Sequence, residues 1–214
     1  MAKNEQETRF HLIDPVLRDK GYDEHRWLKC ETPAPVEPTG NRGSRRRGGG
    51  RTDYLLCIQP AGESAAFPIA VLEAKPETAD PLTGMQQARN YAECKRFALR
   101  YVFSSNGHRF GEFDIGTQRP DGPFPMNRFP ARAELTHRYE QDSGIALAAA
   151  QSKILFQLDS PAYNKPRYYQ DAAIRAAFEN LALRAGRQAG ACATESGHWG
   201  RQDGDRRQPA VASA

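Results

Sequence analysis

The chain has 214 residues, of which 39% are hydrophobic, and its 30 Lys and Arg against 26 Asp and Glu give a formal net charge of +4. This composition allows one hydrophobic core with appendages, and the mild positive charge is compatible with an anionic partner without requiring one. No apolar run approaches the ~20 residues that a membrane span needs, so the composition excludes an integral membrane protein.

The first ten residues, MAKNEQETRF, lack the apolar segment of a secretion signal. The four cysteines are scattered and form no CxxC pair, which argues against a zinc ribbon or a disulfide scaffold. They are Cys30, Cys57, Cys94 and Cys192. We therefore expect a cytoplasmic protein with free thiols and no membrane partner.

In chain order, the first predicted element is a helix over residues 5–20. Phe10, Ile13 and Leu17 recur there at helical spacing. Pro15 lies inside this pattern and predicts a kink, because proline lacks the amide hydrogen that a helix interior needs. A strand is expected around Trp27.

Residues 31–50 are Pro-rich at first and then Arg- and Gly-rich, which predicts a flexible loop. Five arginines lie between positions 42 and 51, and no acidic residue lies among them. They are Arg42, Arg45, Arg46, Arg47 and Arg51. Two interpretations stay open: the guanidinium groups contact DNA phosphates, or the loop only adds solubility.

The next elements predict an α/β core. Residues 52–59 and 67–74 are apolar, β-rich runs joined by turn residues, which indicates a hairpin. An amphipathic helix is predicted over 83–98, and two further strands over 98–107 and 109–116. The order helix, strand, strand, helix, strand is typical of an α/β domain.

Beyond this core the composition of the sequence changes. Residues 117–130 form a Pro-rich stretch that we interpret as a connector. A later amphipathic helix is predicted over 168–185, with Ile174, Phe178 and Leu181 on one stripe. After it, large apolar residues are almost absent, so the end of the chain is expected to be disordered.

Acidic side chains at the predicted hairpin suggest chemistry. Asp53 lies in its first strand, and Glu73 and Lys75 lie at the end of its second strand. Two carboxylates and a backbone carbonyl, here that of Ala74, form the hard oxygen site that Mg²⁺ prefers. A lysine on the same face can orient a water or stabilise charge on a phosphate. The alternative is a solvated Glu–Lys pair at a strand end.

The surrounding residues favour the functional interpretation. GRTDY at 50–54, VLEAK at 71–75, and Gln87 and Tyr91 on the following helix resemble the PD-(D/E)xK nuclease core of the RecB-like group. Thr52 stands where the family name has proline. Gln87 and Tyr91 are four residues apart and so share a helix face, where both can hydrogen-bond a phosphate or order the lysine.

The resemblance extends over about residues 5–186. ETRFHLIDPVLRDKGY, LEAKPE, PLTGMQQARNYAE and VFSSNGHRFGEFD follow in the order of the N-terminal domain of type I restriction endonuclease R (motor) subunits. RYYQDAAIRAAF resembles the segment that leads into their helicase motor, which implies adenine contacts of the Q-motif kind for Tyr169 and Gln170. Glu7 matches an acidic position that helps hold metal in related nucleases; the alternative is a Glu favoured by the helix dipole.

This resemblance implies a domain organisation. A restriction-endonuclease-like core, with a mixed central sheet flanked by helices, is expected over 1–118. A connector and the start of a motor domain, including the Q-motif-like segment, are expected over 119–186. A disordered tail is expected over 187–214.

The resemblance also implies a function. It indicates a Mg²⁺-dependent endonuclease of the type I site-specific deoxyribonuclease family, which hydrolyses double-stranded DNA within a restriction–modification complex with modification and specificity subunits. Asp53 and Glu73 would bind metal, Lys75 would position the nucleophile, and Gln87 and Tyr91 would support the phosphate. ATP would bind the full-length parent but not this chain.

Two alternatives stay open. The chain is a catalytically inactive, truncated form of such a subunit that binds DNA or docks to partner subunits, or it is a stand-alone nuclease of another RecB-like family.

The tail carries a separate hypothesis. Codons for residues 196–204, read one base downstream, can spell Leu-Ala-Thr-Gly-Ala-Gly-Lys-Thr, a phosphate-binding loop of the kind a motor requires. A frameshift after about Gly186 is therefore expected to have removed the ATP site. A natural disordered tail is the alternative.

Overall fold

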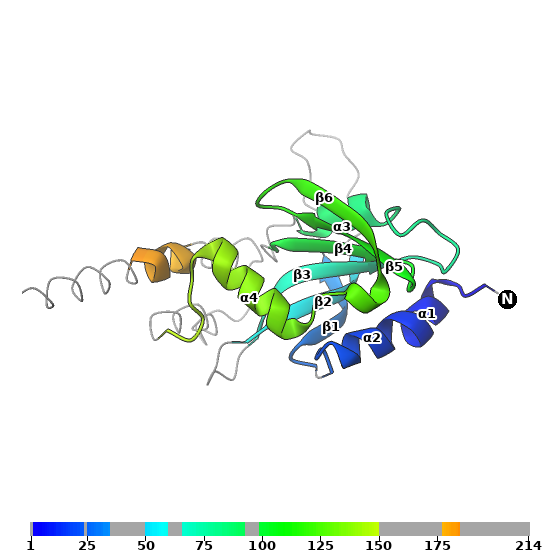
Figure 1. Ribbon diagram of the computed structural model, residues 1–214, viewed down its shortest axis with the longest axis horizontal. Helices are drawn as coiled ribbons and strands as arrows, with labels where there is room; N and C mark the ends of the chain where they lie inside the picture. Colours follow the sequence, from blue (N-terminus) through cyan, green and yellow to red (C-terminus); the bar gives the residue numbers. More distant parts are fainter. Residues whose placement is uncertain are drawn as a thin grey trace, which may run out of the picture.

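The computed structural model describes residues 2–23, 25–34, 50–59, 66–92, 99–149 and 177–184. This part centres on one six-stranded sheet, whose strands lie side by side in chain order (Figure 1). The strands are β1 Leu28–Ala34, β2 Gly50–Ile58, β3 Phe67–Ala74, β4 Tyr101–Ser105, β5 Arg109–Asp114 and β6 Arg119–Pro125. All neighbours are antiparallel except β3 and β4, which are parallel.

Helices flank this mixed sheet, which confirms the predicted α/β class. They are α1 Glu5–Thr8, the π-helical η1 Arg9–Ile13, α2 Asp14–Asp19, α3 Met85–Ala92, the 3-10 turn η2 Met126–Arg128 and α4 Arg132–Ser143. Because parallel strands cannot be joined by a tight turn, the chain crosses from β3 to β4 through α3. The predicted hairpin β2–β3 is present, and the two further predicted strands, β4 and β5, also pair in an antiparallel manner.

The N-terminal helix runs through three segments, and its middle segment is a π-turn. Pro15 lies in the first turn of α2, and the amide of Asp14 just before it donates to the carbonyl of Arg9. A proline ring clashes with the carbonyl four residues earlier in a regular α-helix, and a wider turn ahead of it relieves that clash. The predicted kink at Pro15 therefore takes the form of η1. Gly21, at φ +85°, follows the helix end.

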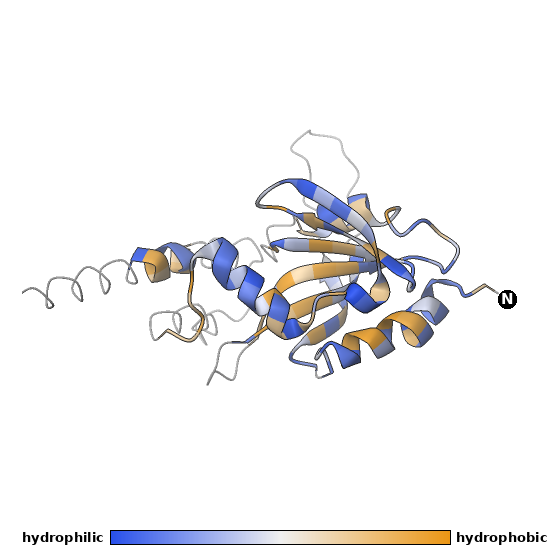
Figure 2. Ribbon diagram, in the orientation of Figure 1, coloured by the Kyte–Doolittle hydropathy of each residue, from blue (hydrophilic) through white to orange (hydrophobic). Residues whose placement is uncertain are grey.

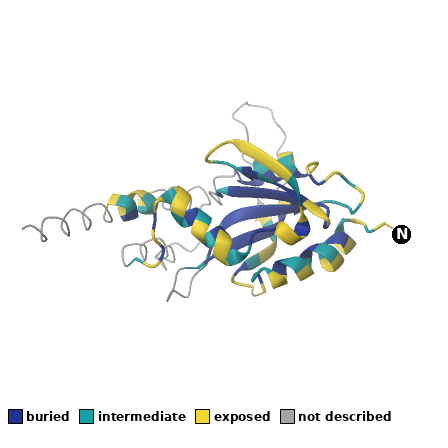
Figure 3. Ribbon diagram, viewed as in Figure 1, coloured by how far each residue is buried: buried dark blue, intermediate teal, exposed yellow. Residues whose placement is uncertain are grey.

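The central strands of the sheet are hydrophobic and buried (Figures 2 and 3), and their side chains belong to two apolar clusters. On one face, Ile13 and Leu17 from the N-terminal helix and Leu135 from α4 join the larger buried cluster. On the other face, Ala88 and Ala92 of α3 pack in a smaller one. The central strands read as continuous apolar runs because they are buried on both sides.

The stretch at 117–130, predicted to be a connector, belongs instead to the sheet. Residues 119–125 form β6, which pairs with β5. Prolines are tolerated there because an edge strand leaves one side without ladder hydrogen bonds. The predicted domain boundary after 118 therefore cuts a β-hairpin. Phe129, beyond that hairpin, is buried against Phe103 and Phe110.

Two further predictions need correction. The flexible loop predicted over 31–50 is wrong at both ends, because residues 31–34 belong to β1 and Gly50 opens β2, and the residues between them lie outside the described ranges. Residues 177–184 are helical, as expected, but Leu181 is 49% exposed and Ala182 is the buried residue. Phe178 packs against the core as predicted, so the prediction is wrong only for Leu181, whose place is taken by Ala182.

Several predictions fall on residues outside the described ranges. These are the four arginines of the 31–50 loop, the end of the helix predicted over 83–98, Ile174, Tyr169, Gln170 and the tail at 187–214. Among the helices that the structure does describe, none has the length and apolar character to cross a membrane.

Phe129→Ala tests whether the residues after 118 are part of the core. We expect it to lower the free energy of unfolding by roughly 3–5 kcal/mol, because it removes a buried ring that contacts two others. Phe10→Ala is the matched control: its ring is 64% exposed, so its effect should stay within roughly 0.5 kcal/mol. Equal effects of the two substitutions in denaturant titrations would contradict the placement of Phe129 in the hydrophobic core.

Candidate active site

The β2–β3 hairpin brings the two predicted carboxylates together. Tyr54 and Leu72 are partners in the antiparallel register, so Asp53 and Glu73 are the next opposing pair. The Asp53 side chain crosses to the neighbouring strand, where its Oδ2 accepts a hydrogen bond of 2.8 Å from the amide of Ala74. The structure thus places the predicted pair side by side.

The lysine and the helix residues join this pair through a chain of hydrogen bonds. Lys75 Nζ lies 3.0 Å from Glu73 Oε1 and donates to Gln87 Oε1 at 3.1 Å. Gln87 Nε2 in turn donates to the Tyr91 hydroxyl at 3.1 Å. Glu73, Lys75 and the two helix residues therefore lie in one connected network.

Burial makes the two carboxylates electrostatically unusual. Only 10% of the Asp53 side chain and 3% of the Glu73 side chain are exposed. Burial, followed by the nearby Asp53 charge, raises the pKa of Glu73 to about 7. Burial also raises the pKa of Asp53, although the Ala74 amide and Arg9 oppose that shift. The pair of carboxylates therefore favours the uptake of a proton or the binding of a cation.

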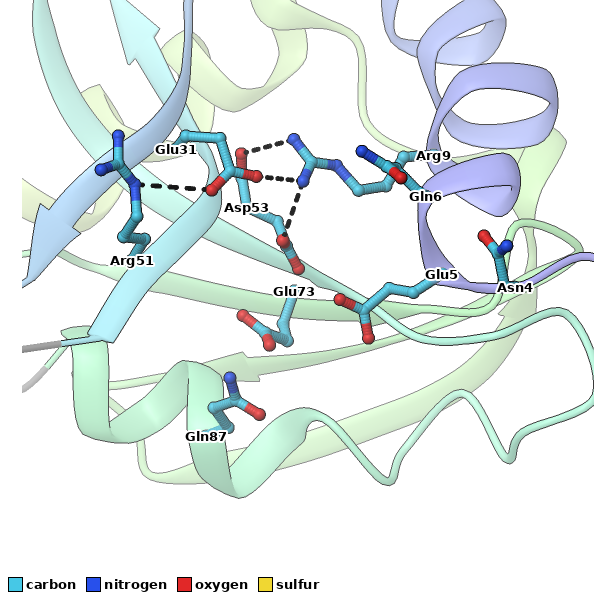
Figure 4. Close-up of a pocket in the computed structure, with 9 residues that line it drawn as sticks. All are labelled: Asn4, Glu5, Gln6, Arg9, Glu31, Arg51, Asp53, Glu73 and Gln87. Carbon is cyan, nitrogen blue, oxygen red and sulfur yellow. Dashed lines mark hydrogen bonds and ion pairs between the residues drawn. The ribbon is translucent and has the colours of Figure 1, made fainter.

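The N-terminal helix contributes a cation that sequence reasoning missed. Arg9 Nη1 lies 3.2 Å from Asp53 Oδ1, and its guanidinium stacks over the Tyr54 ring at 4.9 Å. Arg9 also bonds the carboxylate of Glu31, which in turn lies 3.5 Å from Arg51 (Figure 4). An arginine on an amphipathic helix carries no sequence signal that separates it from solvated surface charge.

These residues surround a pocket of about 520 Å³ that the N-terminal helix, β1, β2, β3 and α3 share (Figure 4). Its lining is almost entirely polar. The lining residues are Asn4, Glu5, Gln6, Arg9, Glu31, Arg51, Asp53, Glu73 and Gln87. Such a pocket suits a charged ligand rather than an apolar one.

Glu7, predicted as a possible further metal ligand, does not line this pocket. Its carboxylate accepts a 3.0 Å hydrogen bond from the Asn4 amide, and the Asn4 side chain accepts one of 2.9 Å from the Glu7 amide. This is a capping box, so Glu7 acts at the helix N-terminus, where its charge also suits the helix dipole, and its role as a metal ligand stays a prediction. Glu5, two residues earlier and roughly 200° around the helix, lines the pocket instead.

Two glycines allow the site to be this compact. A Cβ on Gly84 would lie 2.4 Å from Ser104 Oγ and 2.7 Å from Lys75 Cε. A Cβ on Gly50 would lie 2.5 Å from the Tyr91 hydroxyl. A side chain at either position would push apart the groups that form the network.

The donor set fits a divalent cation of the Mg²⁺ kind. In the described part of the chain, Glu73 Oε2 is buried and has no hydrogen-bond partner, which is unusual for a carboxylate oxygen. No three His, Cys, Asp or Glu side chains gather into a metal site within the described residues. Two carboxylates with the Ala74 carbonyl match Mg²⁺, which commonly takes one or two carboxylates and keeps several waters.

The fold and this site define an α/β domain with an acidic pair and a lysine at the end of a hairpin. No protein-family model and no curated protein matches the chain. Among solved structures, it is similar to one described as a fragment of a candidate HsdR subunit of a type I restriction enzyme from Vibrio vulnificus YJ016. The identity is 32%, the TM-score is 0.62, and the match covers 85% of this chain and 33% of that chain. The chain thus spans about a third of that chain's length.

Glu73→Gln tests the buried acid. A folded-state pKa of about 7, above the ordinary 4.5, means that the folded protein binds more protons than the unfolded one between these pH values. Wild-type stability should therefore fall as pH rises from about 4.5 to 7. Without metal, Glu73→Gln should become more stable than wild type by up to roughly 3 kcal/mol at pH 8, with little gain near pH 4.5.

The control is Glu134→Gln, which removes the same charge from an exposed position on α4. Its unfolding free energy should follow the wild-type pH profile. The free energy of unfolding of each variant is measured by denaturant titration in chelator from pH 4.5 to 8. Identical pH profiles for Glu73→Gln and Glu134→Gln would contradict the raised pKa of Glu73.

Proposed function

We propose that the chain is a Mg²⁺-dependent DNA endonuclease domain of the PD-(D/E)xK class, of the kind carried by the R subunit of type I restriction enzymes. The observation that carries this proposal is that Asp53 and Glu73 line one polar pocket and that Lys75 Nζ lies 3.0 Å from the Glu73 carboxylate. Similarity to an HsdR fragment supports a restriction-endonuclease-like fold and a restriction–modification role. The reaction would be hydrolysis of a phosphodiester bond in double-stranded DNA.

The carboxylates of Asp53 and Glu73, with the carbonyl of Ala74, would hold the metal. When bound, Mg²⁺ supplies a water of lowered pKa and positive charge beside the scissile phosphate. Glu73 is suited to this task because its Oε2 is desolvated and unpaired among the described residues. A carboxylate in that state gains more from a cation than a solvated one would.

Lys75 would orient the attacking water and stabilise charge on the phosphate. Its ammonium group is held between Glu73 and Gln87, and only 14% of the side chain is exposed. A preorganised donor of this kind stabilises developing charge without having to reorganise during the reaction. Tyr91 fixes the Gln87 amide, so the helix residues position Lys75 rather than carry charge themselves.

The wider context is also part of the proposal. Modification and specificity subunits would supply the recognition of DNA, and a motor that uses ATP would belong to a longer parent protein. Support for this context comes from the similarity to the HsdR fragment, which covers a third of that chain. The predicted adenine contacts, Tyr169 and Gln170, lie outside the described residues.

A non-catalytic DNA-binding or subunit-docking module is the second candidate. The ion pair between Arg9 and Asp53 favours it, because the guanidinium already compensates a carboxylate that the metal would need. Metal-dependent cleavage separates the two candidates: the module would bind DNA or partner subunits but would not cut.

We expect the purified chain to cleave supercoiled plasmid with Mg²⁺ or Mn²⁺, and Asp53→Ala, Glu73→Ala and Lys75→Ala each to reduce cleavage to background. Groups that act as one unit do not compensate for one another. Glu134→Ala is the folded control with an exposed charge removed. Wild-type cleavage rates in the Glu73→Ala protein would show that this site is not the nuclease centre.

Gln87→Ala and Tyr91→Phe should slow cleavage less than loss of a metal ligand does. Gln87→Ala removes two hydrogen bonds of the positioning network and Tyr91→Phe removes one, and the loss of each bond corresponds to about a tenfold effect or less. Metal affinity, measured by calorimetry, should be almost unchanged in both variants. A loss of affinity as large as that of Asp53→Ala would mean that these residues are ligands.

A further inference from the structure

Both carboxylate oxygens of Asp53 are already engaged. Oδ2 accepts a 2.8 Å hydrogen bond from the Ala74 amide, and Oδ1 lies 3.2 Å from Arg9 Nη1. Arg9 Nη2 also reaches the Asp53 backbone carbonyl at 3.5 Å. A cation that binds Asp53 must therefore share Oδ1 with the guanidinium or displace it.

Arg9 has a second anionic partner besides Asp53, the carboxylate of Glu31. The same Nη1 bonds the carboxylate of Glu31 on β1. Register partners Cys30↔Tyr54 and Thr32↔Thr52 flank the point where Glu31 faces Asp53. Figure 4 shows the guanidinium between the two carboxylates, with Glu73 and Glu5 beyond Asp53.

The backbone of Glu31 is unusual. Its φ is +50°, in the left-handed region that residues with a side chain rarely adopt. Such a conformation persists only when its surroundings hold it, and it is frequent at binding sites. Here it lies within β1 opposite Asp53, and the Glu31 carboxylate binds both Arg9 and Arg51.

We propose that Arg9 is the resident counterion of Asp53, that a divalent cation binds by displacing it, and that Glu31 is the acceptor that keeps the displaced guanidinium. This inference rests on the proposed function for the identity of the metal site. It adds two residues, Arg9 and Glu31, that set the affinity of that site for its metal.

The charges of the pocket make the exchange feasible. Four carboxylates line it, those of Glu5, Glu31, Asp53 and Glu73, against the two guanidinium groups of Arg9 and Arg51. After displacement Arg9 would keep Glu31 and the face of Tyr54, so no buried cation is left without a partner. Arg9 also begins the π-turn η1, and π-turns in α-helices are frequent at functional sites.

Metal titration of the full chain, stripped of metal beforehand, tests the exchange. Mn²⁺ followed by electron paramagnetic resonance, and Mg²⁺ by calorimetry, give the dissociation constants. Arg9→Gln should bind metal about tenfold more tightly or better, because the direct competitor is gone. Glu31→Gln should bind several-fold more weakly, because Arg9 then has Asp53 as its remaining carboxylate.

Arg51→Gln is the matched control. Arg51 is a second arginine of the same pocket that contacts Glu31, and no contact joins it to Asp53 among the described interactions. General removal of positive charge would tighten metal binding similarly in both variants, whereas direct competition predicts a clearly larger effect for Arg9→Gln. Equal effects, or unchanged or weaker binding in Arg9→Gln, overturn the inference.

A double-mutant cycle distinguishes two ways in which Glu31 could affect metal affinity: by holding Arg9, or by its negative charge alone. If Glu31 acts by holding Arg9, then Glu31→Gln should change metal affinity much less in an Arg9→Gln background than in wild type. An equal loss in both backgrounds contradicts this role. Arg9→Lys keeps the charge without the planar fork that spans two carboxylates, and should fall between wild type and Arg9→Gln.

Failure of the inference and failure of the proposed function give different results. Metal binding that Asp53→Asn abolishes, but that is equal in wild type and Arg9→Gln, overturns the inference alone. Absence of Asp53-dependent metal binding in every variant overturns both. Circular dichroism melting verifies folding, and if Arg9→Gln does not fold, Arg9→Lys and Glu31→Gln carry the test.

Discussion

The antiparallel register of β2 and β3 is the constraint on which the site depends. The pairing of Tyr54 with Leu72 brings Asp53 beside Glu73 and lets the Ala74 amide bind the Asp53 carboxylate. Because side chains alternate between the faces of a strand, a slip by one residue would move one carboxylate to the opposite face. Burial of both strands on both faces makes such a slip costly, so the hydrophobic core itself fixes the position of the acidic pair.

That arrangement places two carboxylates where water cannot solvate them. Burial and mutual repulsion raise the pKa of Glu73, and the structure offsets only part of the cost, through the Ala74 amide, Lys75 and Arg9. An unpaired, desolvated carboxylate oxygen is unfavourable for folding, yet it is the feature that gives a cation site its affinity. The same two side chains therefore lower the stability of the fold and would supply the affinity of the proposed cation site.

Much of this could be predicted from local sequence. The alternating or continuous apolar pattern of 52–59 and 67–74 indicated two strands, and the turn residues between them indicated a hairpin. Asp53 and Glu73 could then be expected to approach, and residues spaced by four on the next helix, Gln87 and Tyr91, to share a face. These inferences succeed because strand alternation and helix periodicity act over a few residues, within reach of a pattern in the chain.

Other features were decided only by tertiary structure. β6 escaped prediction because its prolines are compatible with a strand only at the edge of a sheet, and the sequence alone does not show which strand will lie at an edge. Glu5 rather than Glu7 faces the pocket because the docking of the N-terminal helix sets its rotation. Arg9 and Glu31 meet Asp53 through the packing of that helix and a left-handed residue in β1. By itself, the sequence determined the β2–β3 hairpin, the helix that follows it and the acids that the hairpin brings together. That Arg9 is the cation beside those acids depended on contacts between segments far apart in the chain.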